Sequence, residues 1–354
     1  MLKSIKAGLI GFGNAGKFYH APYINCVPGF HLYKIRETKP QNIQYAADMF
    51  PDTIVVTDSR NIIDDKEVDL VIIAAPSHMH VELAKKALMA GKHVVVDKPF
   101  ALKAWDADEL MTLAEDNKRV LTVYHNRRFA SDFKTVKHIV ESGRLGDVVD
   151  MELNFDRFNK SINRDWWKDN NLPGSGLLYE IGPHLIDMAI CLFGLPDQVF
   201  AHLRILRKEA MVTDCFEIIL SYPHVKVALK ASMLAKDPRP QFAIYGTNGS
   251  FLKYGMDIQE SDIKKGLTPK TKTPWGYEPE DMWGTLTTNE NGIDVKEKIP
   301  SLPGNYGYFY ENLYQHICNE AQLAVKPQEA REGIKIIELC LQSQAERKML
   351  SFKN

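Results

Sequence analysis

The chain has 354 residues, of which 45% are hydrophobic and 25% are charged, and its formal net charge at pH 7 is −1. This length exceeds one ordinary hydrophobic core and predicts two domains. The near-zero charge excludes the large basic surface of nucleic-acid-binding proteins, and apolar runs such as LVIIAA are too short to span a bilayer.

The cysteines are scattered, odd in number and without a CxxC pair: Cys26, Cys191, Cys215, Cys318 and Cys340. This pattern is typical of reduced thiols and not of a disulfide framework, so we expect a cytoplasmic protein. No set of His, Cys and carboxylates has metal-ligand spacing, and no metal is predicted.

The first third of the chain alternates short, mostly β-branched apolar runs with longer helical patterns. Strands are expected at residues 5–10, 31–35, 53–57, 69–75, 93–97 and 119–124, and helices at residues 81–91 and 104–117. Strands that alternate with helices predict βαβ units and a parallel sheet covered on both faces. We therefore predict a doubly wound α/β Rossmann domain over residues 1–124.

A GxGxxG pattern follows the first strand, in AGLIGFGNAG. Gly11 permits the tight turn, Gly13 lets the backbone approach a pyrophosphate, and Gly16 lets helix and strand pack closely. The N-terminus of the next helix favours phosphate. A merely tight turn is the alternative, but the βαβ context favours a dinucleotide bound by this turn: Gly11, Phe12, Gly13, Asn14 and Gly16.

The second strand ends in IRETK, where Glu37 is placed to bind the ribose hydroxyls of NAD. Arg36, Thr38 and Lys39 surround it, and such groups also hold the 2′-phosphate of NADP. A further alternative is that all four are only solvated residues at the strand end. The sequence predicts NAD or NADP without deciding between them.

Lys98 follows the fifth strand in HVVVDKPF, between Asp97 and Pro99. Ligands of open α/β sheets bind at this carboxyl edge, and Pro99 restricts the backbone of Lys98. Lys98 is therefore a candidate to stabilise charge on a reacting oxygen. The alternative is an exposed lysine paired with Asp97.

The preceding strand ends in PSHMHVE, at the same edge of the sheet. Pro76 and His80 are candidates to contact the nicotinamide or its ribose, together with Asp97 and Lys98. A histidine that only caps the following helix is an equal alternative for His80.

After about residue 148 the pattern changes to the alternation of antiparallel strands with one solvated face. Strands are expected at residues 150–158, 199–206, 215–222, 226–233 and 241–246. Residues 255–304, rich in Pro, Gly, Thr and charge, are expected to form a long excursion, and residues 329–348 an amphipathic helix. We predict an α+β second domain over residues 125–354, with an open, mostly antiparallel sheet.

Glu180 and His184 stand four residues apart in SGLLYEIGPHLID. Because proline is accepted in the first turn of a helix and not in its interior, the helix is predicted to begin at Gly182–Pro183, with Glu180 on the incoming turn. The helix dipole then disfavours imidazolium at His184, which suits a proton acceptor. A capping Glu180 and a merely buried His184 are the alternatives.

Two further segments offer substrate contacts. HNRRF, residues 125–129, follows the last Rossmann strand and contributes Asn126 and Arg127. NRDWWKDNN, residues 163–171, offers Trp166 or Trp167 as an apolar face for a sugar ring, with Trp166 as the candidate substrate residue, although indoles in loops more often anchor packing.

GFGNAG, DKPF, HNRRF and SGLLYEIGPHLID occur in one chain and in this order. With them the sequence resembles the Gfo/Idh/MocA oxidoreductases nearly end to end. YHNRRFASDF, TDCFEIILSYP, GSFLKYGMDIQE, PWGY and PGNYGYFYENL are most similar to the branch that contains NADP-dependent scyllo-inositol dehydrogenase. The family fold is a Rossmann domain followed by a mostly antiparallel sheet that supplies the substrate site.

The resemblance implies roles for individual residues. Lys98 matches the family lysine, with Asp97 where E-K-P is usual, and His184 matches the family histidine, with Glu180 where an Asp is usual. The implied activity is NAD(P)-dependent dehydrogenation of a cyclic polyol or sugar by a homodimer or homotetramer. His184 would be the base, Lys98 would polarise the reacting oxygen, and Asn126 and Glu180 would position substrate.

Two other functions stay open at this stage. One is a dinucleotide-dependent sensor or corepressor that does no chemistry. The other is an NAD-assisted sugar-modifying enzyme without net redox change. The specific sugar, the physiological direction and the effect of Glu180 in place of Asp are also undecided.

Overall fold

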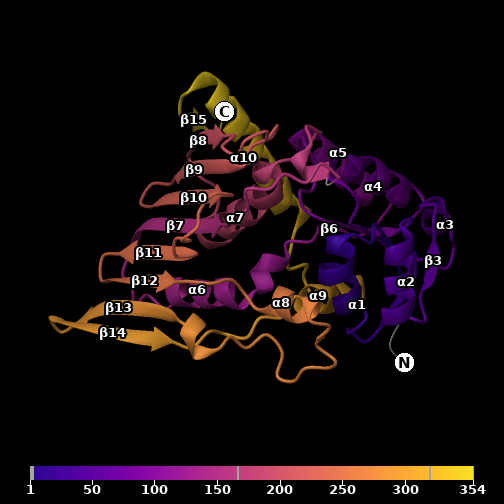
Figure 1. The fold of residues 1–354 in the computed structure, drawn as a ribbon, viewed down its shortest axis with the longest axis horizontal. Coiled ribbons are helices and arrows are strands. Elements are labelled where there is room, and N and C mark those ends of the chain that lie inside the picture. The colour runs from indigo at the N-terminus through magenta and orange to yellow at the C-terminus, as the bar shows by residue number, and fades with distance from the viewer. Residues whose placement is uncertain (1–3, 166, 319, 354) are drawn as a thin grey trace. The chain divides into compact units, whose positions relative to one another are not determined.

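The computed structural model describes residues 4–165, 167–318 and 320–353, and they form two compact units (Figure 1). The first unit holds the residues up to 126 together with 259–275 and 305–331. The second unit holds residues 127–258, 276–304 and those from 332 onward. Two late segments of the chain, residues 259–275 and 305–331, thus belong to the first unit. A single boundary after residue 124 would have assigned both segments to the second domain. That division stays a prediction about domains.

The first unit is built on a six-stranded parallel sheet in the order β3–β2–β1–β4–β5–β6. Every residue of β4 and β6 is buried, which means that both faces of the sheet are covered. The predicted doubly wound Rossmann sheet is confirmed. The strands are β1 (Ile5–Ile10), β2 (Phe30–Arg36), β3 (Ile54–Val56), β4 (Leu70–Ile73), β5 (His93–Val96) and β6 (Leu121–Val123).

The helices of this unit include both predicted ones, now α4 and α5. α4 packs on β4 and β5, and α5 packs on α4. The helices and short turns are η1 (Gly16–His20), α1 (Ala21–Ile24), α2 (Pro40–Met49), α3 (Arg60–Ile63), η2 (Ser77–Met79), α4 (His80–Met89), α5 (Ala104–Asp116), α8 (Gln259–Lys264) and α9 (Gly307–Ile317).

The second unit is built on a nine-stranded sheet in the order β14–β13–β12–β11–β7–β10–β9–β8–β15. β7 and β10 pair in parallel and the other neighbours antiparallel, as predicted. The strands are β7 (Val148–Asp156), β8 (Gln198–Arg204), β9 (Cys215–Ser221), β10 (Lys226–Ser232), β11 (Phe242–Gly246), β12 (Gly249–Lys253), β13 (Gly284–Glu290), β14 (Ile293–Ile299) and β15 (Leu350–Ser351).

Along β9 of the second unit, buried residues alternate with intermediate or exposed ones, as expected for a sheet that is covered by helices on one face. α7 packs against β7, β9 and β10. The predicted C-terminal helix is confirmed as α10 (Pro327–Glu346). The remaining helices and turns are η3 (Asn126–Phe129), α6 (Ser131–Glu141), η4 (Trp167–Asp169), α7 (Leu177–Phe193) and η5 (Glu280–Met282). In the part of the chain that the structure describes, no helix is long and apolar enough to cross a membrane.

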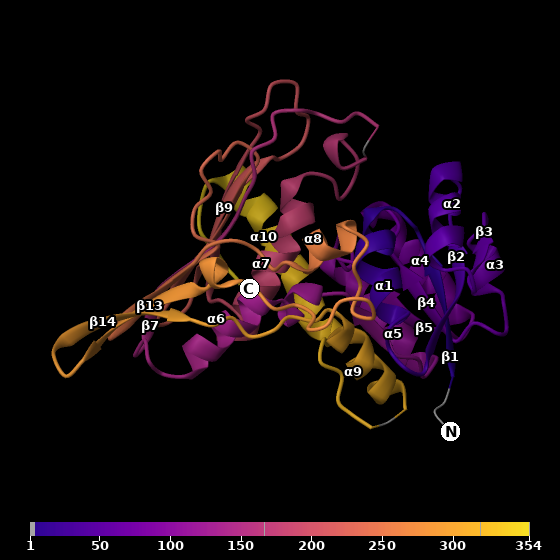
Figure 2. The ribbon, with the colours of Figure 1, turned by 60° about the horizontal axis from the view of Figure 1, so that its bottom comes forward.

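Residues 255–304 are more regular than the predicted excursion. They contain α8 and the hairpin of β13 and β14, which forms one edge of the second sheet (Figure 2). Asn291 and Gly292, with φ of 54° and 85°, connect its strands. Asn-Gly is the preferred pair for such a two-residue turn. The signal was present in the sequence, and the Pro- and Gly-rich composition obscured it.

The helix that carries Glu180 and His184 begins earlier than predicted. α7 starts at Leu177, directly after Gly176 with φ of 83°, and contains Pro183 in its interior. Proline costs a helix about 3 kcal/mol. Leu177 and its neighbours Leu178 and Ile181 are buried, and each buried side chain of this size contributes roughly 1.5–3 kcal/mol. Burial of this first turn therefore outweighs the proline.

Candidate functional site

The three glycines of the turn after β1 have different surroundings. Gly11 has φ of +100°, and an added Cβ would lie 2.5 Å from the carbonyl oxygen of Ala74. A Cβ on Gly16 would lie 2.3 Å from the carbonyl oxygen of Gly11, whereas no described atom lies within 4 Å of a Cβ built on Gly13. Packing requires two of the glycines, and the space over the third is open to a ligand. This arrangement fits a dinucleotide pyrophosphate.

The other predicted residues of the turn divide between core and surface. Asn14 is exposed at the start of the helix, where Lys17 N donates to Gly13 O at 2.9 Å. The first N–H groups of a helix have no helical partner and suit phosphate. The Phe12 side chain is 1% exposed and its ring centroid lies 6.1 Å from that of Phe50. The cofactor contact predicted for Phe12 therefore concerns its backbone, and it stays a prediction.

Glu37 lies just beyond β2 and is bound to the start of α2. Its carboxylate accepts the backbone N–H of Thr38 at 2.7 Å, that of Lys39 at 3.0 Å, and the Asn42 amide at 2.7 Å. Burial raises the pKa of Glu37, but these hydrogen bonds outweigh burial and leave the pKa lowered. The predicted ribose ligand is thus an ionised and oriented carboxylate.

Lys98 follows β5 directly, in a turn that the Asp97 side chain organises. Asp97 N donates to the carbonyl oxygen of Ile73 at 2.8 Å, and Asp97 Oδ1 accepts the backbone N–H of Lys98 at 2.8 Å. The carboxylate therefore holds the main chain at the point where the lysine side chain departs. We name residues 97–99 the lysine turn.

His80 is the first residue of α4 and is 1% exposed. Its Nδ1 lies 2.8 Å from the carbonyl oxygen of Pro99, and its Nε2 lies 2.9 Å from that of Ala75. Burial lowers the pKa of His80, and Asp97 opposes this effect. Both ring nitrogens thus face the main chain. The cofactor contacts predicted for His80 and Pro76 remain predictions.

A buried histidine that sequence reasoning missed lies four residues after Gly16. His20 is fully buried, its Nδ1 lies 2.6 Å from Tyr310 Oη, and its ring lies tilted against that of Tyr124, with centroids 4.2 Å apart and an interplanar angle of 37°. Burial lowers its pKa to about 4, although the charge of Asp97 raises it. Since Tyr310 comes from α9, at the far end of the chain, no local pattern could have found this contact.

In the second unit, Glu180 lies in the first turn of α7 and His184 one turn further on. The Glu180 carboxylate lies 3.3 Å from Lys168 Nζ and 3.7 Å from the Arg157 guanidinium. We name Glu180 and His184 the α7 face. The helix dipole favours Glu180 here. Its predicted effect on His184 is weaker, because the dipole acts mainly within the first turn.

Lys168 and Arg157 were also missed by sequence reasoning. Arg157 follows β7, Lys168 lies in η4, and nothing in their spacing links them to α7. A further ion pair joins η3 to α7, since Asp187 accepts from Arg128 Nε at 2.9 Å and from its Nη2 at 2.6 Å. Such bidentate pairs fix geometry.

The predicted substrate residues of HNRRF lie in η3. Asn126 and Arg127 are each 5% exposed, and the Arg127 guanidinium lies 4.0 Å from the Asp132 carboxylate. Trp166, the predicted sugar platform, lies outside the described residues. The substrate contacts of all three stay predictions.

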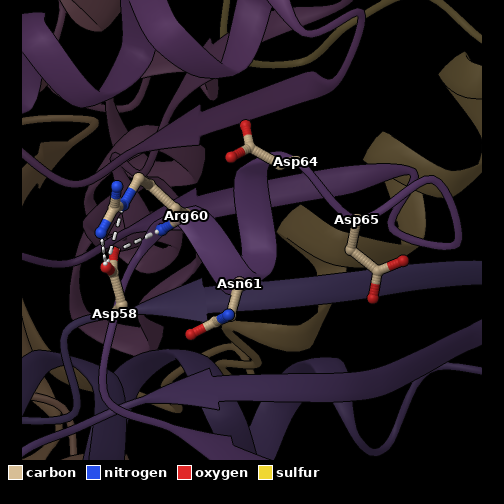
Figure 3. Close-up of a pocket in the computed structure, with 5 residues that line it drawn as sticks. All are labelled: Asp58, Arg60, Asn61, Asp64 and Asp65. Carbon is tan, nitrogen blue, oxygen red and sulfur yellow. Dashed lines mark hydrogen bonds and ion pairs between the residues drawn. The ribbon is translucent and has the colours of Figure 1, made fainter.

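A hollow beside β3 and α3 contains none of the predicted site residues (Figure 3). Asp58 forms an ion pair with Arg60 there at 2.6 Å, and the lining is completed by Asn61, Asp64 and Asp65. Among the described residues, no group of three or more His, Cys, Asp or Glu is placed to hold a metal ion. The catalytic roles of the lysine turn and the α7 face stay predictions.

Two family models match the chain. Residues 5–125 match the model described as "Oxidoreductase family, NAD-binding Rossmann fold", and residues 137–352 match "Oxidoreductase family, C-terminal alpha/beta domain". Together they cover both sheets.

Full-length relatives agree with these models. The chain is 40% identical to an oxidoreductase of Escherichia coli K12, YdgJ, over 99% of both chains. It is 31% identical to the scyllo-inositol 2-dehydrogenase (NADP(+)) IolW of Bacillus subtilis, over 99% of this chain and 97% of the relative. A solved structure of the oxidoreductase YvaA from Bacillus subtilis superposes with a TM-score of 0.94, at 31% identity and over 99% of both chains.

Proposed function

The chain belongs to the Gfo/Idh/MocA family of oxidoreductases and binds NAD or NADP, and from this premise we propose that it oxidises or reduces a cyclic polyol or sugar. The substrate group is a secondary alcohol or the corresponding ketone. The observation that carries the proposal is the α7 face, where a carboxylate and an imidazole stand one helical turn apart. It is supported by the strand-end lysine turn in the Rossmann unit.

The proposed chemistry divides among three side chains. His184 accepts the hydroxyl proton as alcohol becomes ketone and returns it in the reverse direction. Lys98 stabilises the negative charge that develops on the reacting oxygen. Glu180, with Lys168 at 3.3 Å, holds a neighbouring hydroxyl of the substrate and orients the ring. When bound, the nicotinamide of the cofactor supplies or accepts the hydride.

A polyhydroxylated substrate suits the polar groups of the α7 face. A carboxylate flanked by two cations offers both acceptors and donors, which adjacent hydroxyl groups can pair with at once. The name of the IolW relative, an inositol dehydrogenase, supports the same class. We therefore rank inositols first and aldoses second.

The test is a matrix of NAD+ and NADP+ against inositols and common aldoses, followed by the absorbance of reduced nicotinamide. Turnover in any cell that disappears in His184→Gln supports the proposal. Dinucleotide binding without turnover in the whole matrix would instead support a sensor or corepressor. Release of an aglycone without net cofactor reduction would support the NAD-assisted sugar-modifying alternative.

We further propose that the chain forms a homodimer or homotetramer through the sheet face opposite α7. That face carries the ion pairs Lys226–Asp150 and Lys230–Glu152, and Tyr245 is 45% exposed. Aromatic residues are enriched in subunit contacts, whereas Lys, Asp and Glu are depleted from their centres, so we place Tyr245 at the centre of the contact and the ion pairs at its rim. A size measurement that finds only monomer would overturn this assignment.

A reducing compartment suits the thiols of the chain. None of the five cysteines, all of which the structure describes, forms a disulfide, and burial raises the pKa of Cys340, which keeps that thiol protonated. We propose a cytoplasmic location, which fractionation of the native source can test.

A further inference from the structure

His80 joins the ends of two neighbouring strands in the Rossmann unit. One ring nitrogen faces the carbonyl oxygen of Pro99 at 2.8 Å, and the other faces that of Ala75 at 2.9 Å. β4 and β5 pair in parallel, with Ile73 opposite Val96. The ring therefore spans from the end of β4 to the lysine turn after β5.

Both acceptors are carbonyl oxygens, so each hydrogen bond needs an N–H on the ring. A neutral imidazole has one N–H and satisfies one carbonyl, whereas imidazolium has two and satisfies both. Burial and the charge of Lys98 lower the pKa of His80, while Asp97 and the two carbonyls raise it. His20 is a further titratable group that interacts with this ring. At least one bond is available in either protonation state.

The position of His80 gives the contact a rigid base. It begins α4, which packs on both strands that the ring connects. On the opposite side of the lysine, Asp97 Oδ1 accepts the Lys98 N–H at 2.8 Å. The main chain on either side of the Lys98 Cα is thus bound by a buried or half-buried side chain.

We propose that His80 is a positioning residue for Lys98, which it serves by holding the main chain of the lysine turn. This inference rests on the proposed function, in which Lys98 acts on the reacting oxygen. A loosened turn would move the ammonium group, and a displacement of about 1 Å can cost about 10²-fold in rate. The proposal replaces the nicotinamide contact predicted for His80, because both of its ring nitrogens face main-chain carbonyls, and dinucleotide affinity would then be spared.

The test compares three full-length variants. His80→Leu removes both donors, His80→Gln keeps an amide donor, and His78→Leu alters an exposed histidine in the preceding η2 turn as a control. The measurements are kcat and KM on the substrate found in the matrix, the Kd of the dinucleotide, and the pH profile of Lys98 acylation by mass spectrometry. If His80→Leu does not fold, His80→Met, which also has no side-chain N–H donor, takes its place.

We expect His80→Leu to lower kcat about tenfold or more, with a change of less than about twofold in the dinucleotide Kd. It should also shift the pH at which Lys98 is acylated. His80→Gln should recover part of both effects, and His78→Leu should match the wild type.

A Lys98 acylation profile in His80→Leu that equals the wild type would overturn the proposal. So would a loss confined to thermal stability and dinucleotide affinity. If the wild type turns over none of the substrates, the proposed function fails, and the acylation profile still decides the role of His80.

Discussion

The lysine turn and the α7 face hold their reactive groups in opposite ways. The lysine turn is held through its main chain, because the Asp97 carboxylate accepts the Lys98 N–H and His80 faces the Pro99 carbonyl oxygen. Glu180 is held by the side chains of Lys168 and Arg157. Contacts to the main chain of the lysine turn are determined by the position of the strand ends in the sheet. Ion pairs at Glu180 depend instead on which side chains occur in other segments of the chain. We therefore expect the lysine turn to serve any substrate and the α7 face to select one.

The largest effects should come from the two reactive groups themselves. Lys98→Met and His184→Gln should each lower kcat by about 10²–10⁴-fold, the usual contribution of an acid–base group or an oxyanion donor. A base must be deprotonated to act, so kcat should fall at low pH in the wild type, and His184→Gln should lose that limb of the profile. Lys98→Met should keep it. Near-wild-type turnover in either variant would remove that residue from the mechanism.

The contrast also explains what the sequence could predict. Local patterns predict the glycine turn, the Rossmann strands and the position of Lys98. This is possible because the turn and the lysine each lie directly after a strand whose end is visible in the sequence. Pro183 was misleading for the opposite reason. The free-energy cost of a proline inside a helix is a local effect, and the sequence-based prediction included it. The burial of Leu177, Leu178 and Ile181 is a tertiary effect, which a local pattern does not show.

The partners of the reactive groups were the least predictable part. Lys168 and Arg157 contact Glu180 from outside its helix, and Tyr310 contacts His20 from 290 residues away in the sequence. The Asn291–Gly292 hairpin is a different case. Its signal was local and sufficient, and it would have been found by reading turn pairs before composition.

Two glycines of the turn after β1 allow a matched pair of alanine substitutions, one of which affects packing and the other dinucleotide binding. Gly16→Ala should destabilise the fold by about 1–3 kcal/mol, as overpacking does, because its Cβ would lie 2.3 Å from the Gly11 carbonyl oxygen. Gly13→Ala meets no described atom within 4 Å and should leave stability unchanged. It should weaken dinucleotide binding about tenfold, which corresponds to about 1.4 kcal/mol, because the added methyl group would occupy the space that is open to the pyrophosphate. Thermal unfolding and a binding titration check both. Equal unfolding temperatures for the two variants would contradict the assignment.

His20 should make the Rossmann unit sensitive to acid. Its pKa is lowered from 6.5 to about 4 in the folded chain, so the unfolded chain binds more protons between these values. Stability is therefore complete above about pH 6.5 and is lost as the pH falls toward 4. Between pH 7.5 and pH 5 the loss should be about 2 kcal/mol. Urea unfolding of the wild type and of His20→Gln measures it, and an identical pH slope in the two proteins would exclude His20 as the source.

The smallest expected effect tests the comparison most directly. If side chains orient Glu180, the substitutions Lys168→Met and Glu180→Gln should not be additive in their effects on the KM for the polyol. A double-mutant cycle should give a coupling energy of about 0.2–1 kcal/mol, the range for a partly exposed ion pair. Lys160→Met, in the same segment but exposed, is the matched control and should show no coupling to Glu180. Because Arg157 also lies within 4 Å of the carboxylate, the coupling energy should grow when Arg157→Met is present, since Lys168 then supplies a larger share of the positive charge beside Glu180. Strict additivity in both backgrounds would mean that Glu180 is oriented by α7 alone, and selectivity would then lie in the helix itself.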